Sequence, residues 1–220
     1  MLALASDNIN YALHLYGRQL GGLMKTNKQT GEQTKKLVLT ALLTAIVALL
    51  SYFGGFIKIG GLASISLTLI PVVLGAALCG PWVGTFLGFI SGLFFLFNPA
   101  DSSFWINISP LGTIFTVLLK GSMCGLCAGF AYKLLEKVNR YFAVIVSAIV
   151  CPVVNTGIFL IGCRLFFWDT VVQGAESEGK SIIAYLLVAF VGLNFVFELI
   201  VNIVLSPAIL RIINIRKRMN

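Results

Sequence analysis

The sequence predicts an all-α membrane protein, a compact bundle of six transmembrane helices. Its 220 residues are 58% hydrophobic and 11% charged, with a mean hydropathy of +0.96, and a water-soluble domain of this size cannot hide that much apolar surface. Six apolar stretches approach or exceed the roughly 17–25 residues that cross a bilayer. Lysine and arginine collect at the ends of these stretches rather than in one patch, which argues against a nucleic-acid partner and for contact with membrane lipid.

The predicted spans follow the apolar runs in chain order. They cover residues 37–53, 65–78, 83–97, 111–132, 142–167 and 182–213. Gly80-Pro81 predicts a tight turn between the second and third spans, because proline lacks the N–H that a continuing helix needs. Pro71 predicts a kink or a break in the second span.

Positive charge predicts the orientation of the bundle in the membrane. With six spans, three basic clusters fall on one side, which we expect to be cytoplasmic and to hold both termini of a multi-pass protein of the cell membrane. The clusters are Lys25, Lys28, Lys35 and Lys36; Lys133, Lys137 and Arg140; and Arg211, Arg216, Lys217 and Arg218. The predicted parts are a cytoplasmic extension, 1–36, partly disordered or dispensable; the six-helix transmembrane domain, 37–213; and a basic cytoplasmic tail, 214–220.

Two glycine ladders predict close helix packing. A repeat of four places glycines on one helix face, where two backbones can approach each other in lipid. The ladders are Gly84, Gly88 and Gly92 in the third span and Gly121, Gly125 and Gly129 in the fourth.

Polar residues inside the predicted spans cost free energy in the membrane, so we expect each to have an interaction partner or a function. Lys120 and Glu198 lie deepest, and we expect either an ion pair between them or a role for one of them in binding a ligand. Glu198 shares a helix face with Asn194 and Asn202, a polar stripe that must face the bundle interior or a wet cavity.

The fifth span and the second outer connection carry further candidates. Asn155 follows Pro152, which can open the helix locally, and Arg164 either reaches the outer interface or points inward to hold an anion. Between the third and fourth spans, the connection 98–110 contains two aromatic residues and an amide, which suit either an interfacial anchor or a lid over a small polar molecule. These three residues are Phe104, Trp105 and Asn107.

The first span presents two alanines four residues apart, Ala41 and Ala45, a smooth stripe on which another helix can pack closely. The sequence carries no phosphate-binding loop, no metal-ligand spacing and no nucleophile beside a base. We therefore expect no enzyme, metal or cofactor, and energy that comes from another chain or an ion gradient.

The order of these features resembles the substrate-binding S components of energy-coupling factor (ECF) vitamin transporters. The resemblance covers about 37–211 and is carried by the alanine stripe, the segment Ile70-Pro71-Val72-Val73-Leu74-Gly75-Ala76, the Gly80-Pro81 turn and the glycine-rich third span. It implies a subunit that captures a water-soluble vitamin from outside and docks on a transmembrane coupling protein with two ABC-type ATPases.

The family resemblance also implies roles for particular residues. Docking falls to Ala41 and Ala45, and ligand binding near the outer face to Phe104, Trp105, Asn107, Asn155, Arg164, Asn194 and Glu198. The connection 98–110 is similar to the pantothenate branch, so pantothenate is the expected vitamin, with folate and riboflavin still open. The alternative is a self-sufficient secondary carrier for a small anionic metabolite, with Lys120 and Glu198 as an ion relay; a scaffold without a ligand is the third possibility.

Overall fold

A computed structural model of the protein describes residues 30–52 and 67–218. The chain divides into two units, 1–39 and 40–220. The described residues of the first unit, 30–39, are helical and begin the helix Thr30–Tyr52. Most of the predicted extension, and the segment 54–64 between the first two predicted spans, lie outside the described residues.

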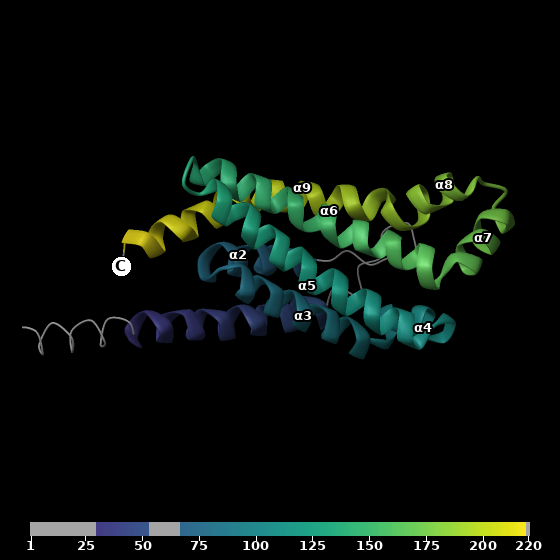
Figure 1. Ribbon diagram of the computed structural model, residues 1–220, viewed down its shortest axis with the longest axis horizontal. Helices are drawn as coiled ribbons and strands as arrows, with labels where there is room; N and C mark the ends of the chain where they lie inside the picture. Colours follow the sequence, from purple (N-terminus) through teal and green to yellow (C-terminus); the bar gives the residue numbers. More distant parts are fainter. Residues whose placement is uncertain (1–29, 53–66, 219–220) are drawn as a thin grey trace, which may run out of the picture. The chain divides into compact units, whose positions relative to one another are not determined.

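The second unit is built from helices, and its described residues contain no strand. After the first helix come α2 (Leu69–Cys79), α3 (Pro81–Phe97), α4 (Pro99–Ile108), α5 (Pro110–Leu135), α6 (Arg140–Phe166), α7 (Trp168–Ser177), α8 (Ile182–Tyr185), the π-helical turn η1 (Leu186–Val191) and α9 (Gly192–Arg218). Helix α3 packs on α5, α5 on α6 and α6 on α9, whereas α2 contacts all four of these helices (Figure 1).

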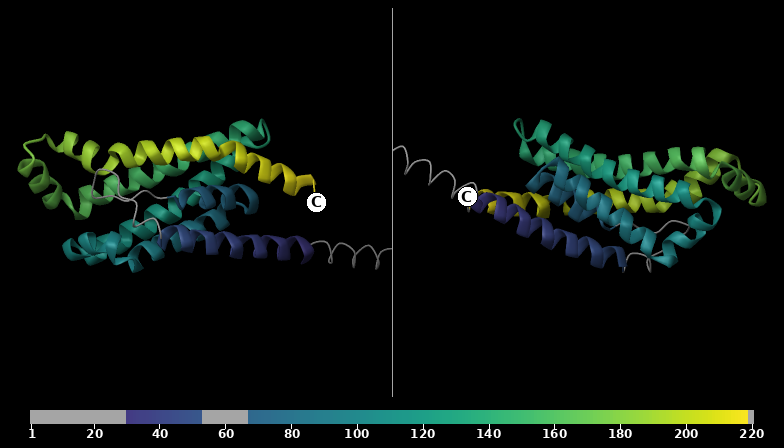
Figure 2. Two further views of the ribbon diagram at one scale, coloured as in Figure 1. Left: turned by 180° about the vertical axis from the view of Figure 1, so that it is seen from behind. Right: turned by 60° about the horizontal axis from the view of Figure 1, so that its bottom comes forward.

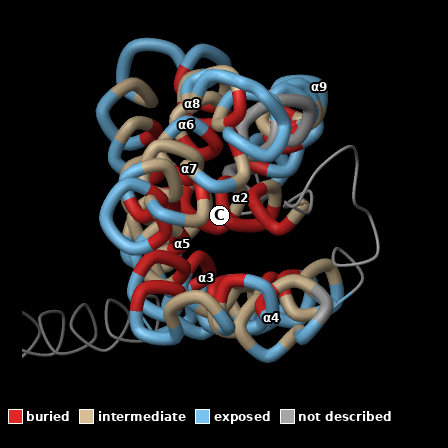
Figure 3. The backbone as a smooth tube through the Cα atoms, turned by 90° about the vertical axis from the view of Figure 1, so that its right-hand side faces the viewer, coloured by how far each residue is buried: buried red, intermediate tan, exposed pale blue. Residues whose placement is uncertain are grey.

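Helix α2 is short because the sequence bounds it closely. It begins at Leu69, so Pro71 lies in its first turn, where a missing N–H costs nothing, and the predicted break does not occur. It ends where Gly80 adopts a φ of 105°, a conformation that suits glycine, and Pro81 then starts α3, as the predicted turn requires. Its buried residues include Leu69, Val72 and Ala76, so α2 is a core helix (Figure 3).

The six predicted spans are not confirmed among the described residues. Four described helices are long and apolar enough to cross a membrane, and α3 with α4 adds a fifth if this pair, bent by 81°, counts as one. With 11 residues, α2 is shorter than the roughly 20 that a bilayer requires. The predicted span 182–213 is divided, because α8 and η1 precede α9.

The two glycine ladders pack closely, as the sequence predicts, and the structure shows that they face each other. A Cβ on Gly88 would overlap the carbonyl oxygen of Gly121, and a Cβ on Gly84 would come within 2.6 Å of the carbonyl oxygen of Gly125. Backbone therefore lies directly on backbone between α3 and α5, and only glycine permits this approach.

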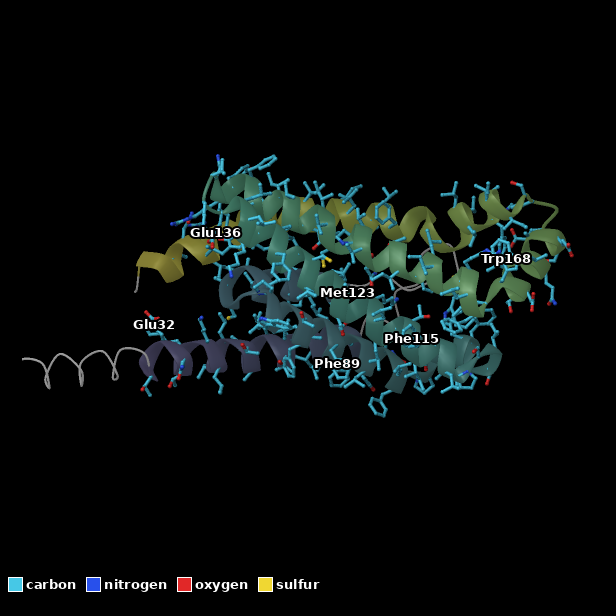
Figure 4. All side chains as sticks on the ribbon, viewed as in Figure 1. Glu32, Phe89, Phe115, Met123, Glu136 and Trp168 are labelled. Carbon is cyan, nitrogen blue, oxygen red and sulfur yellow. The ribbon has the colours of Figure 1, made fainter. Side chains whose placement is uncertain are left out.

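The ends of the bundle differ in what they carry. The turn between α5 and α6, marked by Glu136 in Figure 4, lies at the same end as the C-terminal part of α9, and α4, α7 and α8 lie at the other, near Trp168 (Figures 1, 2 and 4). The basic residues Lys137 and Arg140 thus share an end with Arg211.

Two segments that lie between predicted spans are helices. Helix α4 fills 99–108, with Pro99 as its first residue and Asp101 in the first turn, where a negative charge suits the helix dipole. Helix α7 fills 168–177 and buries Val171 and Ala175, which lie four residues apart on one face. Both segments are helical despite their polar composition, because Pro99 and Asp101 favour a helix start in α4 and Val171 and Ala175 pack on one face of α7.

Candidate functional site

A cavity of about 30 Å³ lies among α2, α3, α5 and α6. Its volume suits about two water molecules, since roughly 10–15 Å³ of such space holds one. The lining residues are Thr68, Leu69, Val72, Gly88, Ser91, Gly92, Phe95, Val117, Lys120, Gly121, Cys124 and Asn155.

Helical periodicity explains this lining. Helix α3 contributes residues 88, 91, 92 and 95, and α5 contributes 117, 120, 121 and 124. Both sets follow the spacing i, i+3, i+4, i+7 that marks one face of a helix. The glycines of each face bring the two backbones together, and the larger residues between them, Ser91 and Lys120 among others, form the cavity wall.

Lys120 is the charged residue among those that line the cavity. It lies ten residues after Pro110, about 15 Å along α5, and therefore deep in the predicted membrane span. Its Nζ lies 5.2 Å from the ring centroid of Phe95 and 5.1 Å from that of Phe159, within the range of cation–π attraction. Glu198 on α9 attracts this ammonium electrostatically.

Neutral hydrogen-bonding groups line other parts of the wall. The Ser91 hydroxyl donates to the Thr68 hydroxyl oxygen at 2.8 Å, which joins α3 to the start of α2. Asn155, on α6, is 8% exposed. The cavity thus combines one cation, hydroxyl and amide groups, and an apolar remainder.

An aromatic cluster lies next to the cavity, toward α4 and α7. Trp105, on α4, is 5% exposed and packs edge-on against Phe159 and Phe167, with centroid distances of 5.3 and 5.1 Å. Since Phe159 also lies under Lys120, this ring connects the cluster to the cavity. Trp105 is therefore a core residue here, and Phe104 beside it is 41% exposed.

The structure places the described members of the seven residues predicted to bind ligand in different surroundings. Asn155 lines the cavity, and Glu198, 6% exposed, lies close enough to attract Lys120. Asn107 and Arg164 are exposed, and the Arg164 guanidinium lies 4.2 Å from the Trp168 ring centroid, as expected for a residue at the outer interface. The side chain of Asn194 is outside the described part of the structure.

Sequence reasoning missed three members of the wall, Thr68, Ser91 and Phe95. Ser91 carries a readable signal, because it lies between Gly88 and Gly92 on the packed face of α3. Thr68 precedes the apolar run of α2 and looks like an ordinary helix start. Its role depends on a contact 23 residues away in sequence, which no local pattern reveals.

The first helix separates two kinds of surface. Leu43 and Val47 are 2% and 0% exposed, and Leu43 packs beside Gly75 of α2. Ala41 and Ala45 are exposed, because a rotation of roughly 100° per residue places them on the opposite side of the helix. The alanine stripe is therefore an outer surface of the second unit.

The fold and the cavity define a class, multi-pass membrane proteins built from apolar helices around a small cavity with polar groups in its wall. Within that class, the chain belongs to the family described as ECF transporter, substrate-specific component, whose sequence profile matches residues 35–210. The chain is also 26% identical over 153 residues to the pantothenic acid transporter PanT of Lactococcus lactis subsp. cremoris (strain MG1363), an alignment that covers 64% of this chain and 72% of that protein. No solved structure matches the chain.

Proposed function

We propose that the protein is the substrate-capture subunit of an ECF-type importer, that it binds pantothenate from outside, and that a separate module with two ABC-type ATPases drives uptake. The observation that carries this proposal is the cavity around Asn155 and Lys120 in a chain that belongs to a family of substrate-specific transporter components. The similarity to a pantothenic acid transporter supports pantothenate as the vitamin.

Docking on the coupling protein is assigned to the exposed stripe of Ala41 and Ala45. Small side chains permit close helix approach in lipid, and Leu43 and Val47 hold the other face of the helix against its own bundle. The basic residues near the α5–α6 turn and the end of α9 support a cytoplasmic location for that end. Docking and ligand binding then use different surfaces.

A second candidate function is a self-sufficient carrier for a small anion. The attraction between Lys120 on α5 and Glu198 on α9 favours it, since such a buried pair can relay ions or protons. This candidate requires uptake without any ATPase partner.

A pair of double variants tests the separation of docking from binding. Ala41→Trp with Ala45→Trp places bulk on the stripe, and we expect vitamin uptake in cells to fall at least about tenfold, because close helix contact tolerates no large side chain. Pantothenate binding to the purified variant should change less than about twofold, since neither residue lines the cavity. Both quantities are measured with radiolabelled vitamin.

The matched control carries Val153→Trp and Ile161→Trp, two positions on α6 that are 48% and 59% exposed. It adds the same bulk to another outer face and should leave uptake intact. Normal uptake by the Ala41 and Ala45 variant, at equal amounts in the membrane, would refute the docking assignment.

A further inference from the structure

We propose that Lys120 binds the carboxylate of the substrate, so that the cavity selects small carboxylic acids over neutral and cationic vitamins. The inference rests on the proposed function and assigns the substrate class of the same site.

The position of Lys120 is the first argument. A lysine at the centre of a membrane helix costs about 2.5–3.5 kcal/mol on insertion scales, so packing alone favours an apolar residue there. Its neighbours on the same face of α5, Val117, Gly121 and Cys124, follow that preference. A cation kept at the cavity wall calls for an anionic partner, and a substrate carboxylate in the cavity can serve as that partner beside Glu198.

The surroundings of the ammonium are the second argument. The faces of Phe95 and Phe159 attract the charge of Lys120 but offer weaker acceptors than oxygen, so its N–H donors are best satisfied by an oxygen anion. Burial opposes the charge of Lys120, whereas Glu198 and, less strongly, Asp101 attract it. An oxygen anion in the cavity would add to this attraction at a site where water does not compensate the charge.

The rest of the wall is the third argument. The Ser91–Thr68 hydroxyl pair and the Asn155 amide offer neutral hydrogen-bonding partners for hydroxyl or amide groups of a ligand. Leu69 and Val72 can contact the apolar carbon atoms of that ligand. One cation with neutral polar groups matches a monocarboxylate that also carries hydroxyl and amide groups. A cationic ligand would face Lys120 as a like charge in a desolvated site.

The cavity is smaller than the proposed ligand. A cavity of about 30 Å³ must expand to hold a molecule the size of a vitamin. Helices α3 and α5 lie backbone to backbone, so the expansion has to come from movement elsewhere in the wall.

The test compares pantothenate with panthenol, which has the same skeleton but a primary alcohol where pantothenate has its carboxylate. Binding is measured by titration calorimetry on the purified full-length protein in lipid nanodiscs. The unaltered protein should bind pantothenate at least about tenfold more tightly than panthenol, because a charge-assisted hydrogen bond is lost with the alcohol.

Lys120→Met should weaken pantothenate binding at least about tenfold and change panthenol binding less than about twofold. Because the substitution also removes the charge that attracts the buried Glu198, thermal unfolding checks that the variant is folded, and Lys120→Met with Glu198→Gln removes both charges together. Lys120→Gln provides a second neutral variant of different shape, with the same expected result. Lys133→Met removes a charge from the exposed end of α5 and should preserve the preference for pantothenate.

The outcomes separate the inference from the proposed function. Pantothenate binding with an unchanged preference in both Lys120 variants, or an equal loss for both ligands, overturns the role of Lys120 and leaves the proposed function standing. Saturable binding of thiamine, a cation, or of riboflavin, which is neutral, in place of pantothenate overturns both the vitamin assignment and the inference.

Discussion

At the scale of single residues, the side chains that line the cavity are those that buried polar chemistry favours. Asn155, on α6, is nearly buried. Lys120, on α5, lies against the aromatic rings of Phe95 and Phe159. Phe104, Asn107 and Arg164 are predicted from the sequence to bind ligand because they are polar or aromatic, yet all three are exposed. Residue type alone therefore does not separate a ligand-facing group from an interfacial one.

Asn155 and Asn107 form a matched pair for testing this distinction. Asn155→Ala should raise the pantothenate dissociation constant about three- to tenfold, which corresponds to the loss of one hydrogen bond worth about 1 kcal/mol. Asn107→Ala, on the exposed face of α4, should leave the constant unchanged. Titration of both purified variants measures the effect, and equal constants for the two would argue against the cavity as the site.

At the scale of helices, the contact of α3 with α5 organises the site. The two glycine ladders fix the distance between the helices, and the residues that alternate with the glycines line the cavity. Helix packing and the proposed ligand binding thus use the same two faces. Any side chain added to the ladder should disturb both.

Gly88→Ala tests this contact, because its Cβ would overlap the Gly121 carbonyl oxygen. We expect a loss of about 1–3 kcal/mol of stability, typical of overpacking. Gly157→Ala is the control within α6, where a Cβ meets nothing within 4 Å, and it should stabilise the helix by up to about 1 kcal/mol. Thermal unfolding in detergent compares them, and equal stability of the two variants would contradict backbone-to-backbone packing.

At the scale of the whole molecule, the sequence predicts the all-helical class, the Gly80-Pro81 turn and the glycine packing, because each follows from composition or a local period. The six predicted spans are not confirmed among the described residues, where α2 is an 11-residue core helix. Of the residues predicted to bind ligand, Asn155 lines the cavity. The cavity joins residues from four helices, and no local pattern specifies which of their faces meet.

The central claim is that this chain captures the vitamin and that a separate ATPase module drives its import. The most direct test measures radiolabelled pantothenate uptake by proteoliposomes that contain the purified protein, with and without the coupling protein, the two ATPases and ATP. The account predicts saturable pantothenate binding by the protein alone and uptake only with the complete module and ATP. Uptake by the protein alone, driven by an ion gradient, would contradict the account and favour the self-sufficient carrier.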